Sequence, residues 1–440
     1  MPVYIAVQAL FDGLGSIPYA WTIVKALPWL ALLVLLKRYF GGAVNTSERN
    51  MHSKVVMITG GTAGIGAQVA RELATRGAQL VLLTQHELSD PFVVDYIDDL
   101  RTTTNNFLIT AEQVDLSSLH SIRKFATKWV DNAPPRRLDM IILCANTFTP
   151  AGAKVRTTED GLEESWGVNY IANFHLLSIL SPALRAQPPD RDVRILFSTC
   201  SSYMGGQLPD LSPSNSEEKK PNKASKSKKT GQPKQVLEFN ASSADATSKL
   251  ASMVFASAFQ KHLSAYDRPD KFPMNSRVFV IDPGWTRTPG MRRHLTFGSL
   301  WGLALYLIMW PFWWLVLKSP DQGAQTYLYA AMEAQLGKAA GGKFLKECRE
   351  VRFMRGEIED EKVQQGLWQA SERTIEELEK RGAMARAQQK KKGEDAEKAK
   401  KQAEELAALD ELVKTAKAAK EQDSKKEKQP GSKRNKKSDK

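Results

Sequence analysis

The clearest chemical signal in the sequence is a glycine-rich run, T-G-G-T-A-G-I-G at residues 59–66, between a short apolar stretch and a helical pattern. Glycines at this spacing allow a tight turn and let the backbone approach a pyrophosphate closely. The helix that follows would offer free N–H groups and the positive end of its dipole to phosphates. The run therefore predicts a dinucleotide site rather than a glycine turn without a ligand. Its predicted contacts are Thr59, Gly60, Gly64, Ile65 and Gly66.

Further motifs follow this run in a fixed order. They are V-D-L-S-S at 114–118, L-C-A-N at 143–146, G-V-N-Y at 167–170 and P-G-W-T-R-T at 283–288. Together they resemble the short-chain dehydrogenase/reductase family, and within it the retinol-dehydrogenase-like branch. The L-C-A-N segment shares only its Ala with the family's N-N-A-G, and P-G-W-T-R-T has Thr in place of the Val of P-G-x-V-x-T. The resemblance covers about residues 51–378.

The resemblance implies a Rossmann-type fold that binds NADP(H) or NAD(H). An acid at the end of the second strand would hold the ribose hydroxyls of NAD. Thr84 and Gln85 stand there instead, and His86 falls where relatives often carry an Arg for the extra phosphate of NADP. This pattern favours NADP(H), although Glu87 could reverse the preference. The further cofactor contacts that the resemblance implies are Asp115, Leu116, Asn169, Lys249, Pro283, Gly284 and Thr288.

The family moves a hydride between a nicotinamide and a carbonyl or alcohol, with Ser, Tyr and Lys assisted by Asn. A Tyr hydroxyl protonates the carbonyl oxygen, helped by a nearby Lys ammonium. Residues 246–251 match the tail of Y-x-x-S-K-L-A, which makes Lys249 the Lys and Asn169 the Asn. Asp245 stands where the Tyr is expected, and no Tyr in the sequence has a Lys four residues later. Beside Lys249, the Asp245 carboxyl should be ionised and therefore a poor acid.

The position of the catalytic hydroxyl is ambiguous in the segment after the fifth strand. It could be Thr199 or Ser201, while the ungapped register places Cys200 there, and the segment could also be an ordinary polar loop. Tyr203 could serve as a replacement acid. Ser201 is our candidate for the hydroxyl.

Two functions remain open from the residues. One is a membrane-attached oxidoreductase that acts on a lipophilic alcohol or carbonyl, with a water chain or a protonated Asp245 in place of the Tyr. The other is a cofactor-binding pseudoenzyme that serves as a scaffold.

The elements that must position these residues follow an alternating pattern. Apolar runs of strand length alternate with helical segments such as residues 67–76, which predicts a doubly wound parallel sheet covered on both faces. We therefore expect one α/β domain at 51–380. Its predicted strands are 55–59, 79–83, 106–114, 140–145, 194–198 and 277–281.

Two apolar stretches point to a membrane. Residues 17–36 lie within an expected N-terminal anchor, 1–50, and have about the length that crosses a bilayer. Residues 295–317 are long enough to span, but basic residues flank both ends and Pro311 should kink the segment. We expect this second stretch to be a membrane-embedded hairpin or an interfacial helix, with a buried core helix as the alternative.

The net charge of +13 is concentrated in two segments. Residues 213–239 hold seven Lys against three Glu, and residues 381–440 hold 19 Lys or Arg against 11 Asp or Glu. We interpret the first as a disordered basic insertion and the second as a charged tail, helical near 394–420. Neither interleaves aromatic residues with its lysines, so we expect no nucleic-acid partner.

The three cysteines and six histidines show no metal-binding spacing, and so few cysteines fit a reducing compartment. The resemblance suggests a location on the endoplasmic-reticulum membrane or a lipid droplet, with the domain facing the cytosol. It also suggests a lipophilic small-molecule substrate and a possible homodimer.

Overall fold

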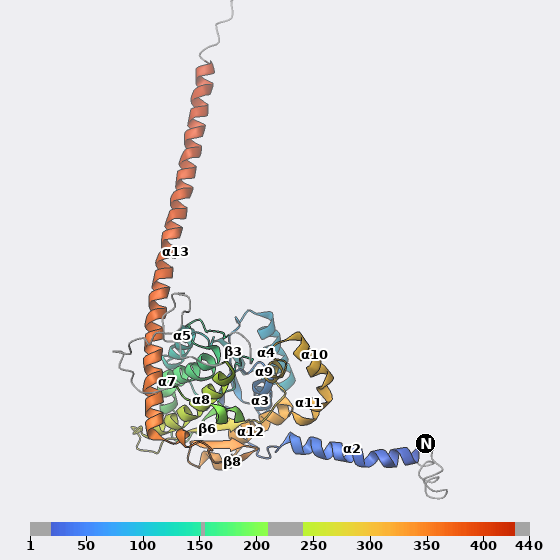
Figure 1. Cartoon of the computed structure of the whole chain (residues 1–440). Coiled ribbons are helices and arrows are strands. Elements are labelled where there is room, and N and C mark those ends of the chain that lie inside the picture. Colours follow the sequence, from blue (N-terminus) through green and yellow to red (C-terminus); the bar gives the residue numbers. More distant parts are fainter. Residues whose placement is uncertain (1–18, 151–154, 210–240, 427–440) are drawn as a thin grey trace, which may run out of the picture. The chain divides into compact units, whose positions relative to one another are not determined.

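An eight-stranded sheet forms the centre of the protein (Figure 1). The computed structural model describes residues 19–150, 155–209 and 241–426. The strand order is β3-β2-β1-β4-β5-β6-β7-β8, and only the last pair, β7 and β8, is antiparallel. The strands are β1 Val55–Thr59, β2 Gln79–Thr84, β3 Ile109–Gln113, β4 Met140–Leu143, β5 Val193–Ser198, β6 Ser276–Asp282, β7 Lys343–Lys346 and β8 Arg349–Val351.

The apolar runs form these strands because a parallel sheet is covered on both faces. All five residues of β1 and all four of β4 are buried. The chain order reverses between these two neighbours, since β2 and β3 lie beyond β1 whereas β5 and β6 lie beyond β4. In open parallel sheets, ligands bind beside the carboxyl ends of the strands at such a reversal. The predicted Rossmann-type sheet is confirmed, and β7 and β8 extend it.

Helices cover the sheet in two groups. α3 (Gly64–Thr75) contacts α4 (Pro91–Thr104) and α12 (Pro320–Met332). α7 (Ala172–Arg185) contacts both α5 (Leu119–Val130) and α8 (Ala241–Ser264). Apolar residues of α3 and α12 form one core with β1 and β2. Aromatic rings join α7 and α8, with Phe174 and Phe255 centred 4.7 Å apart.

The N-terminal helix and the second apolar stretch meet in space. α2 (Ala20–Gly41) contacts α11 (Trp310–Val316), and the Lys37 Nζ donates to the carbonyl oxygen of Trp314 at 2.5 Å. The second stretch is not one continuous helix, because α10 (Leu300–Ile308) and α11 are separated at Met309. Pro311 lies in the first turn of α11, where a missing N–H costs little.

No helix within the described ranges is both long enough and apolar enough to cross a bilayer. Residues 1–18 of the expected N-terminal anchor lie outside the described residues, and the described part, which includes α2, is not supported as a spanning helix.

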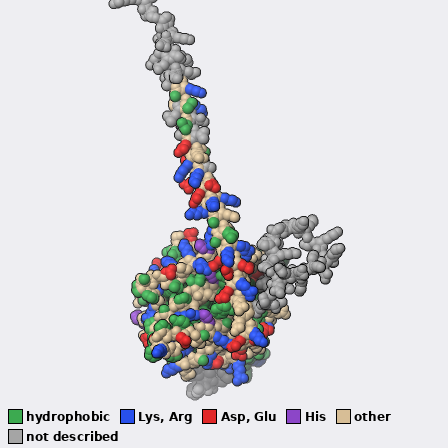
Figure 2. Space-filling view, turned by 90° about the vertical axis from the view of Figure 1, so that its left-hand side faces the viewer, with side chains coloured by type: hydrophobic (Ala, Val, Ile, Leu, Met, Phe, Trp, Pro, Cys, Tyr) green, Lys and Arg blue, Asp and Glu red, His purple; other side chains and the backbone are tan. Residues whose placement is uncertain are grey.

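The C-terminal segment is a long helix, α13 (Glu361–Lys426). Its first turns belong to one compact unit, Met1–Glu376, while Glu377–Lys440 forms a second. Figure 2 shows Lys and Arg mixed with Asp and Glu along this helix, and Lys401 pairs with Glu397 at 3.0 Å. Such pairs one turn apart support a solvated helix. It starts well before the predicted 394–420. The predicted insertion at 213–239 lies outside the described residues.

Candidate active site

The glycine run forms a cradle between β1 and α3. Gly60 has a φ of +67°, and a Cβ there would lie 2.8 Å from the backbone of Ala145. A Cβ on Gly66 would lie 2.3 Å from the Gly60 carbonyl oxygen. Only glycine fits either position, because the β1 and β4 loops and the first turn of α3 approach one another so closely.

The start of α3 is open to an anion. Its N-cap, Ala63, makes no side-chain cap, so Gly64, Ile65 and Gly66 begin the helix with N–H groups that no side chain satisfies. Thr288 faces this turn, 3.4 Å from where a Cβ of Gly64 would stand. The residues present therefore fit the pyrophosphate of a dinucleotide, at the place where the sequence predicts it.

The other predicted cofactor residues lie along the same edge of the sheet. Thr59 is buried at the end of β1 and accepts a hydrogen bond from the Ala145 N–H at 3.2 Å. Asp115 follows β3, beside the end of β2, since the preceding residue donates to the Thr84 carbonyl oxygen at 2.7 Å. Its carboxylate accepts from the Ser117 N–H at 2.8 Å. Leu116 lies in this turn, and Pro283 and Gly284 follow β6.

His86 follows β2 and is partly exposed. Its Nδ1 lies 3.5 Å from the Asp90 carboxylate, and its ring contacts Phe92. Asp90 itself caps α4 by accepting from the Phe92 N–H. The imidazole thus stands at the strand end where a ribose would bind, oriented by an acid that is already part of a helix cap.

Asn169 joins two parts of the site. It lies in a π-helical turn, Gly167–Ile171, a feature that often marks functional positions. Its side chain donates to the Thr147 carbonyl oxygen at 2.9 Å and accepts from the Thr147 N–H at 2.8 Å. It also donates to the Ser248 hydroxyl on α8 at 3.2 Å. Asn169 therefore ties the loop after β4 to the helix that carries Lys249.

Lys249 and Asp245 lie one turn apart on α8 but have different partners. The Lys249 Nζ donates to the Ser198 carbonyl oxygen, 3.4 Å away at the end of β5. The Asp245 Oδ2 accepts from the Ser202 hydroxyl at 3.1 Å, whereas its buried Oδ1 has no donor among the described residues. The two charged groups do not form an ion pair with each other in the described structure. Asp245 is only 8% exposed.

The hydroxyls after β5 divide between two neighbourhoods. Ser201, the predicted catalytic hydroxyl, donates to the buried Asp282 carboxylate at 3.1 Å and accepts from Lys346 at 3.2 Å. Thr199 is buried and Tyr203 packs against Phe344, 6.1 Å between ring centres.

Cys200 and Ser202 instead lie beside Asp245. The Cys200 Sγ is 2.9 Å from the Ser202 hydroxyl, which itself bonds the carboxylate. Sequence reasoning did not single out Ser202. The one available signal was the dense run of Ser, Thr and Cys at residues 198–202.

Two thiols and a phenol near the site have raised pKa values. Burial raises the pKa of Cys144 to about 12, against the opposing effects of the Tyr327 hydroxyl and the Lys249 ammonium. Burial also raises the pKa of Cys200, and the Asp245 carboxylate adds to that rise. Tyr327 on α12 has its pKa raised well above the usual value, chiefly by burial. All three groups are therefore protonated at neutral pH.

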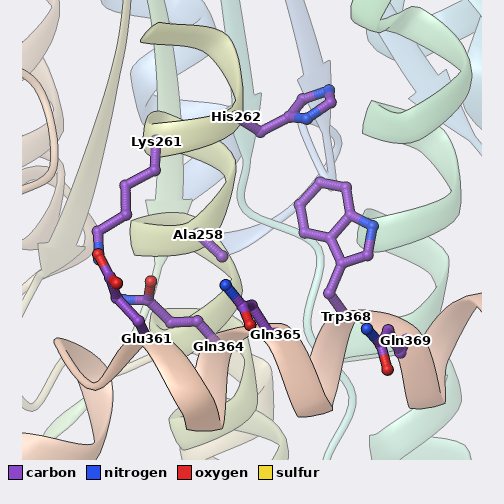
Figure 3. Close-up of a pocket in the computed structure, with 8 residues that line it drawn as sticks. All are labelled: Ala258, Lys261, His262, Glu361, Gln364, Gln365, Trp368 and Gln369. Carbon is purple, nitrogen blue, oxygen red and sulfur yellow. The ribbon is translucent and has the colours of Figure 1, made fainter. Parts of the chain in front are cut away.

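A separate cavity of about 280 Å³ lies between α8 and the first turns of α13 (Figure 3). His262 and Trp368 face it from the two helices, with ring centres 5.1 Å apart. It contains none of the predicted cofactor or catalytic residues.

Comparisons with known proteins agree with this arrangement. A family model described as short chain dehydrogenase matches residues 54–201. The chain is 41% identical to an uncharacterized oxidoreductase, pbr1, of Schizosaccharomyces pombe, over 84% of this chain and 93% of that protein. It is 30% identical to mouse retinol dehydrogenase 13, over 78% and 90% respectively.

Among solved structures, a protein from Mycobacterium paratuberculosis matches with a TM-score of 0.50 at 21% identity. That match covers 76% of this chain and 98% of the other. At this identity the match shows a shared fold.

Proposed function

The chain belongs to the short-chain dehydrogenase/reductase family of oxidoreductases, which act on CH–OH and C=O groups, and on this premise we propose that it binds NADP(H) and acts on a lipophilic alcohol or carbonyl. The observation that carries the proposal is the cradle at the start of α3. Gly64 in this cradle lies beside Thr288, Asn169 ties the loop after β4 to α8, and Lys249 bonds the end of β5.

The chain's own residues would divide the work of binding. Gly60, Gly64 and Gly66 would hold the pyrophosphate, and Asp115 would lie beside the adenine. When bound, the nicotinamide accepts or supplies the hydride. The Lys249 ammonium adds positive charge at the end of β5, where a substrate oxygen would gain negative charge during reduction.

We base the proposed preference for NADP(H) over NAD(H) on the residues at the end of β2. Thr84 is the last residue of that strand, and His86 is the first exposed basic side chain after it. An imidazole can meet a phosphate, whereas an acid would be needed to hold both ribose hydroxyls. Glu87 lies next to it and keeps NAD(H) as the alternative.

A lipophilic substrate is supported by what surrounds the site. The chain leaves the cradle at Thr288, forms α9 (Pro289–Leu295), α10 and α11, and returns at Lys318, which pairs with Thr286 in a parallel bridge. His294 of α9 packs on Phe148, 4.7 Å between ring centres, above the loop that Asn169 holds. The apolar segment 289–317 therefore starts and ends beside the predicted reaction centre.

The same segment, 289–317, supports attachment to a bilayer surface. Its exposed apolar side chains include Trp301, which is 88% exposed, and α2 adds Trp21 and Trp29. Exposed apolar patches of this kind mark membrane or protein contacts, and indoles favour the membrane interface. Arg292 and Arg293 stand next to the patch and can meet anionic lipid.

Flotation with anionic phospholipid vesicles tests this attachment. Trp301→Asp with Ile308→Asp should weaken vesicle binding by about tenfold or more, because two apolar side chains lose their burial in lipid. The control is Phe107→Asp with Leu108→Asp, two exposed apolar residues before β3. Equal loss in both pairs would contradict attachment through α10.

A scaffold that binds the cofactor without turnover is the second candidate. It is favoured by Asp245, which the resemblance to the family predicts at the place of the usual acid. Titrating the purified protein with NADPH and NADH, followed by protein fluorescence, tests the shared premise. We expect binding, tighter for NADPH, and binding of neither nucleotide would rule out both candidates.

Turnover then separates the two candidates. The enzyme predicts oxidation of long-chain or isoprenoid alcohols, or reduction of the matching aldehydes. The scaffold predicts cofactor binding without turnover.

A further inference from the structure

Three polar side chains form a continuous row where the family's acid would stand. The Cys200 Sγ lies 2.9 Å from the Ser202 Oγ, which lies 3.1 Å from the Asp245 Oδ2. Cys200 follows β5, Ser202 lies in the 3-10 turn Ser201–Gly205, and Asp245 belongs to α8. Residues 43 positions apart in the sequence are thus joined by one hydrogen bond.

The direction of the row follows from the donors available. An ionised carboxylate only accepts hydrogen bonds, so the Ser202 hydroxyl donates to Asp245. The Ser202 oxygen is then left to accept, and the protonated Cys200 thiol is its donor. The Ser202 oxygen therefore keeps capacity for one further donor, while its own proton already points at a carboxylate.

Position makes Ser202 the accessible member of the row. Asp245 is buried and shorter than the Tyr that the family places there, so its carboxylate alone does not reach as far. The Ser202 hydroxyl stands one hydrogen bond beyond the carboxylate and is exposed. A substrate hydroxyl can thus approach Ser202 without entering the core. The Asp245 Oδ1, with no donor in the described structure, leaves the carboxylate with room for a proton.

We propose that Ser202 and Asp245 form the proton-accepting pair of this site, with Ser202 as the residue that touches the substrate alcohol and Asp245 as the final base. This inference rests on the proposed function, because it needs an alcohol and an oxidised nicotinamide. It deepens that function by assigning the favoured direction, alcohol oxidation.

Alcohol oxidation at this pair moves one hydride and one proton. The alcohol's C–H bond breaks, and its electron pair leaves with the hydrogen as hydride for the oxidised nicotinamide that the proposed function supplies. The alcohol O–H bond breaks as a new O–H bond forms on Ser202, and the original Ser202 proton moves to the Asp245 Oδ2. The products are the carbonyl compound and a neutral Asp245, which returns its proton to solvent through the exposed Ser202.

The central test is Ser202→Ala, assayed for oxidation of a long-chain alcohol. We expect kcat to fall by between about tenfold and a thousandfold, because the accepting hydroxyl is lost, while nucleotide affinity stays at the wild-type value. Ser202→Thr should restore much of the rate. The matched control is Ser257→Ala, on the same α8 but bonded to Gln364.

The pH profile separates a proton acceptor from a structural hydroxyl. Oxidation by the wild type should fall at acidic pH, since Asp245 must be unprotonated to accept. Asp245→Asn and Ser202→Ala should each lose this acidic limb along with most of the rate. A role in packing alone would lower the rate equally at every pH.

A second readout needs neither cofactor nor turnover. The Cys200 thiol can be alkylated at a series of pH values and followed by peptide mass spectrometry, apart from Cys144 and Cys348. Asp245→Asn removes a negative charge and should lower the pKa of Cys200. Once Cys200 is ionised, the Ser202 hydroxyl can turn from Asp245 and donate to the thiolate, so Ser202→Ala should raise the pKa of Cys200.

The outcomes are distinguishable. A slow Ser202→Ala variant with normal nucleotide binding and opposite shifts at Cys200 supports the pair. Full kcat in Ser202→Ala, no shift at Cys200 in either variant, or a wild type that binds nucleotide without oxidising alcohols overturns it. A wild type that binds no nucleotide removes the proposed function itself, even where the Cys200 shifts appear.

Discussion

The β1–α3 turn and the β5–α8 region lie at the same edge of one sheet, yet they relate to the family in different ways. In the β1–α3 turn, the groups that would contact the cofactor are backbone N–H groups, and every glycine that exposes them is present. In the β5–α8 region, the groups are side chains, and Asp245, which the sequence predicts at the place of the family's Tyr, is paired with Ser202. A site whose contacts are backbone N–H groups depends on the conformation of the chain. A site whose contacts are side chains can change its chemistry when one residue is substituted.

The largest effect is expected from filling the cradle. Gly66→Ala places a Cβ 2.3 Å from the Gly60 carbonyl oxygen, so backbone must move, at a cost of about 1–3 kcal/mol in the free energy of unfolding. NADPH binding, measured by titration, should be lost. Gly205→Ala, in the β5–α8 region, has no atom within 4 Å of the new Cβ and should bind normally. Equal behaviour of the two variants would contradict the contrast.

Restoring the phenol should have the next largest effect. Asp245→Tyr should raise reduction of a lipophilic aldehyde by about tenfold to a thousandfold, because an acid again reaches the carbonyl oxygen. NADPH consumption measures this rate. Asp245→Phe has the same ring without the hydroxyl and should show no gain. A wild type that already reduces aldehydes as fast as Asp245→Tyr would show that the replacement costs nothing.

Removing the Lys249 ammonium should weaken both cofactor binding and turnover. Lys249→Met loses the ammonium that lies at the end of β5, and we expect NADPH affinity and turnover each to fall by about tenfold. Calorimetric titration measures the affinity. Lys261→Met, on the same helix but paired with Glu361 at the surface, is the control. If both variants bind alike, Lys249 serves only the fold.

The smallest effect concerns the Cys144 thiol. Burial raises the pKa of Cys144 to about 12, so its alkylation should become faster by about tenfold per pH unit between pH 8 and 11 without levelling off. The unfolded thiol ionises near its usual pKa, so stability should decline as the pH rises from about 9 to 12. Thermal melts of Cys144→Ala should show a shallower alkaline decline, and an equal decline would contradict the assignment.

Local patterns were sufficient for most of the fold. Continuous apolar runs predicted β1, β2, β4, β5 and β6, because strands buried on both faces must be apolar throughout. β7 and β8 escaped prediction. β7 (K-F-L-K) and β8 (R-E-V) are short and carry charge, so their sequences resemble loops, and only pairing with β6 makes them strands.

The candidate site residues also fall into two groups, those that local sequence locates and those that only packing locates. The glycine run, Asn169 and Lys249 could be located from the sequence, because their chemistry depends on spacing within one turn of chain. Ser202 could not, since its partner is 43 residues away, and Ser201 was an equally good candidate by type. Only the structure shows that Ser201 bonds Asp282 while Ser202 bonds Asp245.

The sequence by itself thus determined a parallel α/β sheet and the glycine turn between β1 and α3, and it predicts phosphate binding there and Asp245 in place of the usual acid, because these depend on residue type and local spacing. Tertiary structure decided which hydroxyl meets Asp245, that Lys249 contacts β5 rather than that carboxylate, and that the apolar stretch divides into α10 and α11 beside α2. These depend on distances between segments remote in sequence, and only packing around the sheet sets those distances.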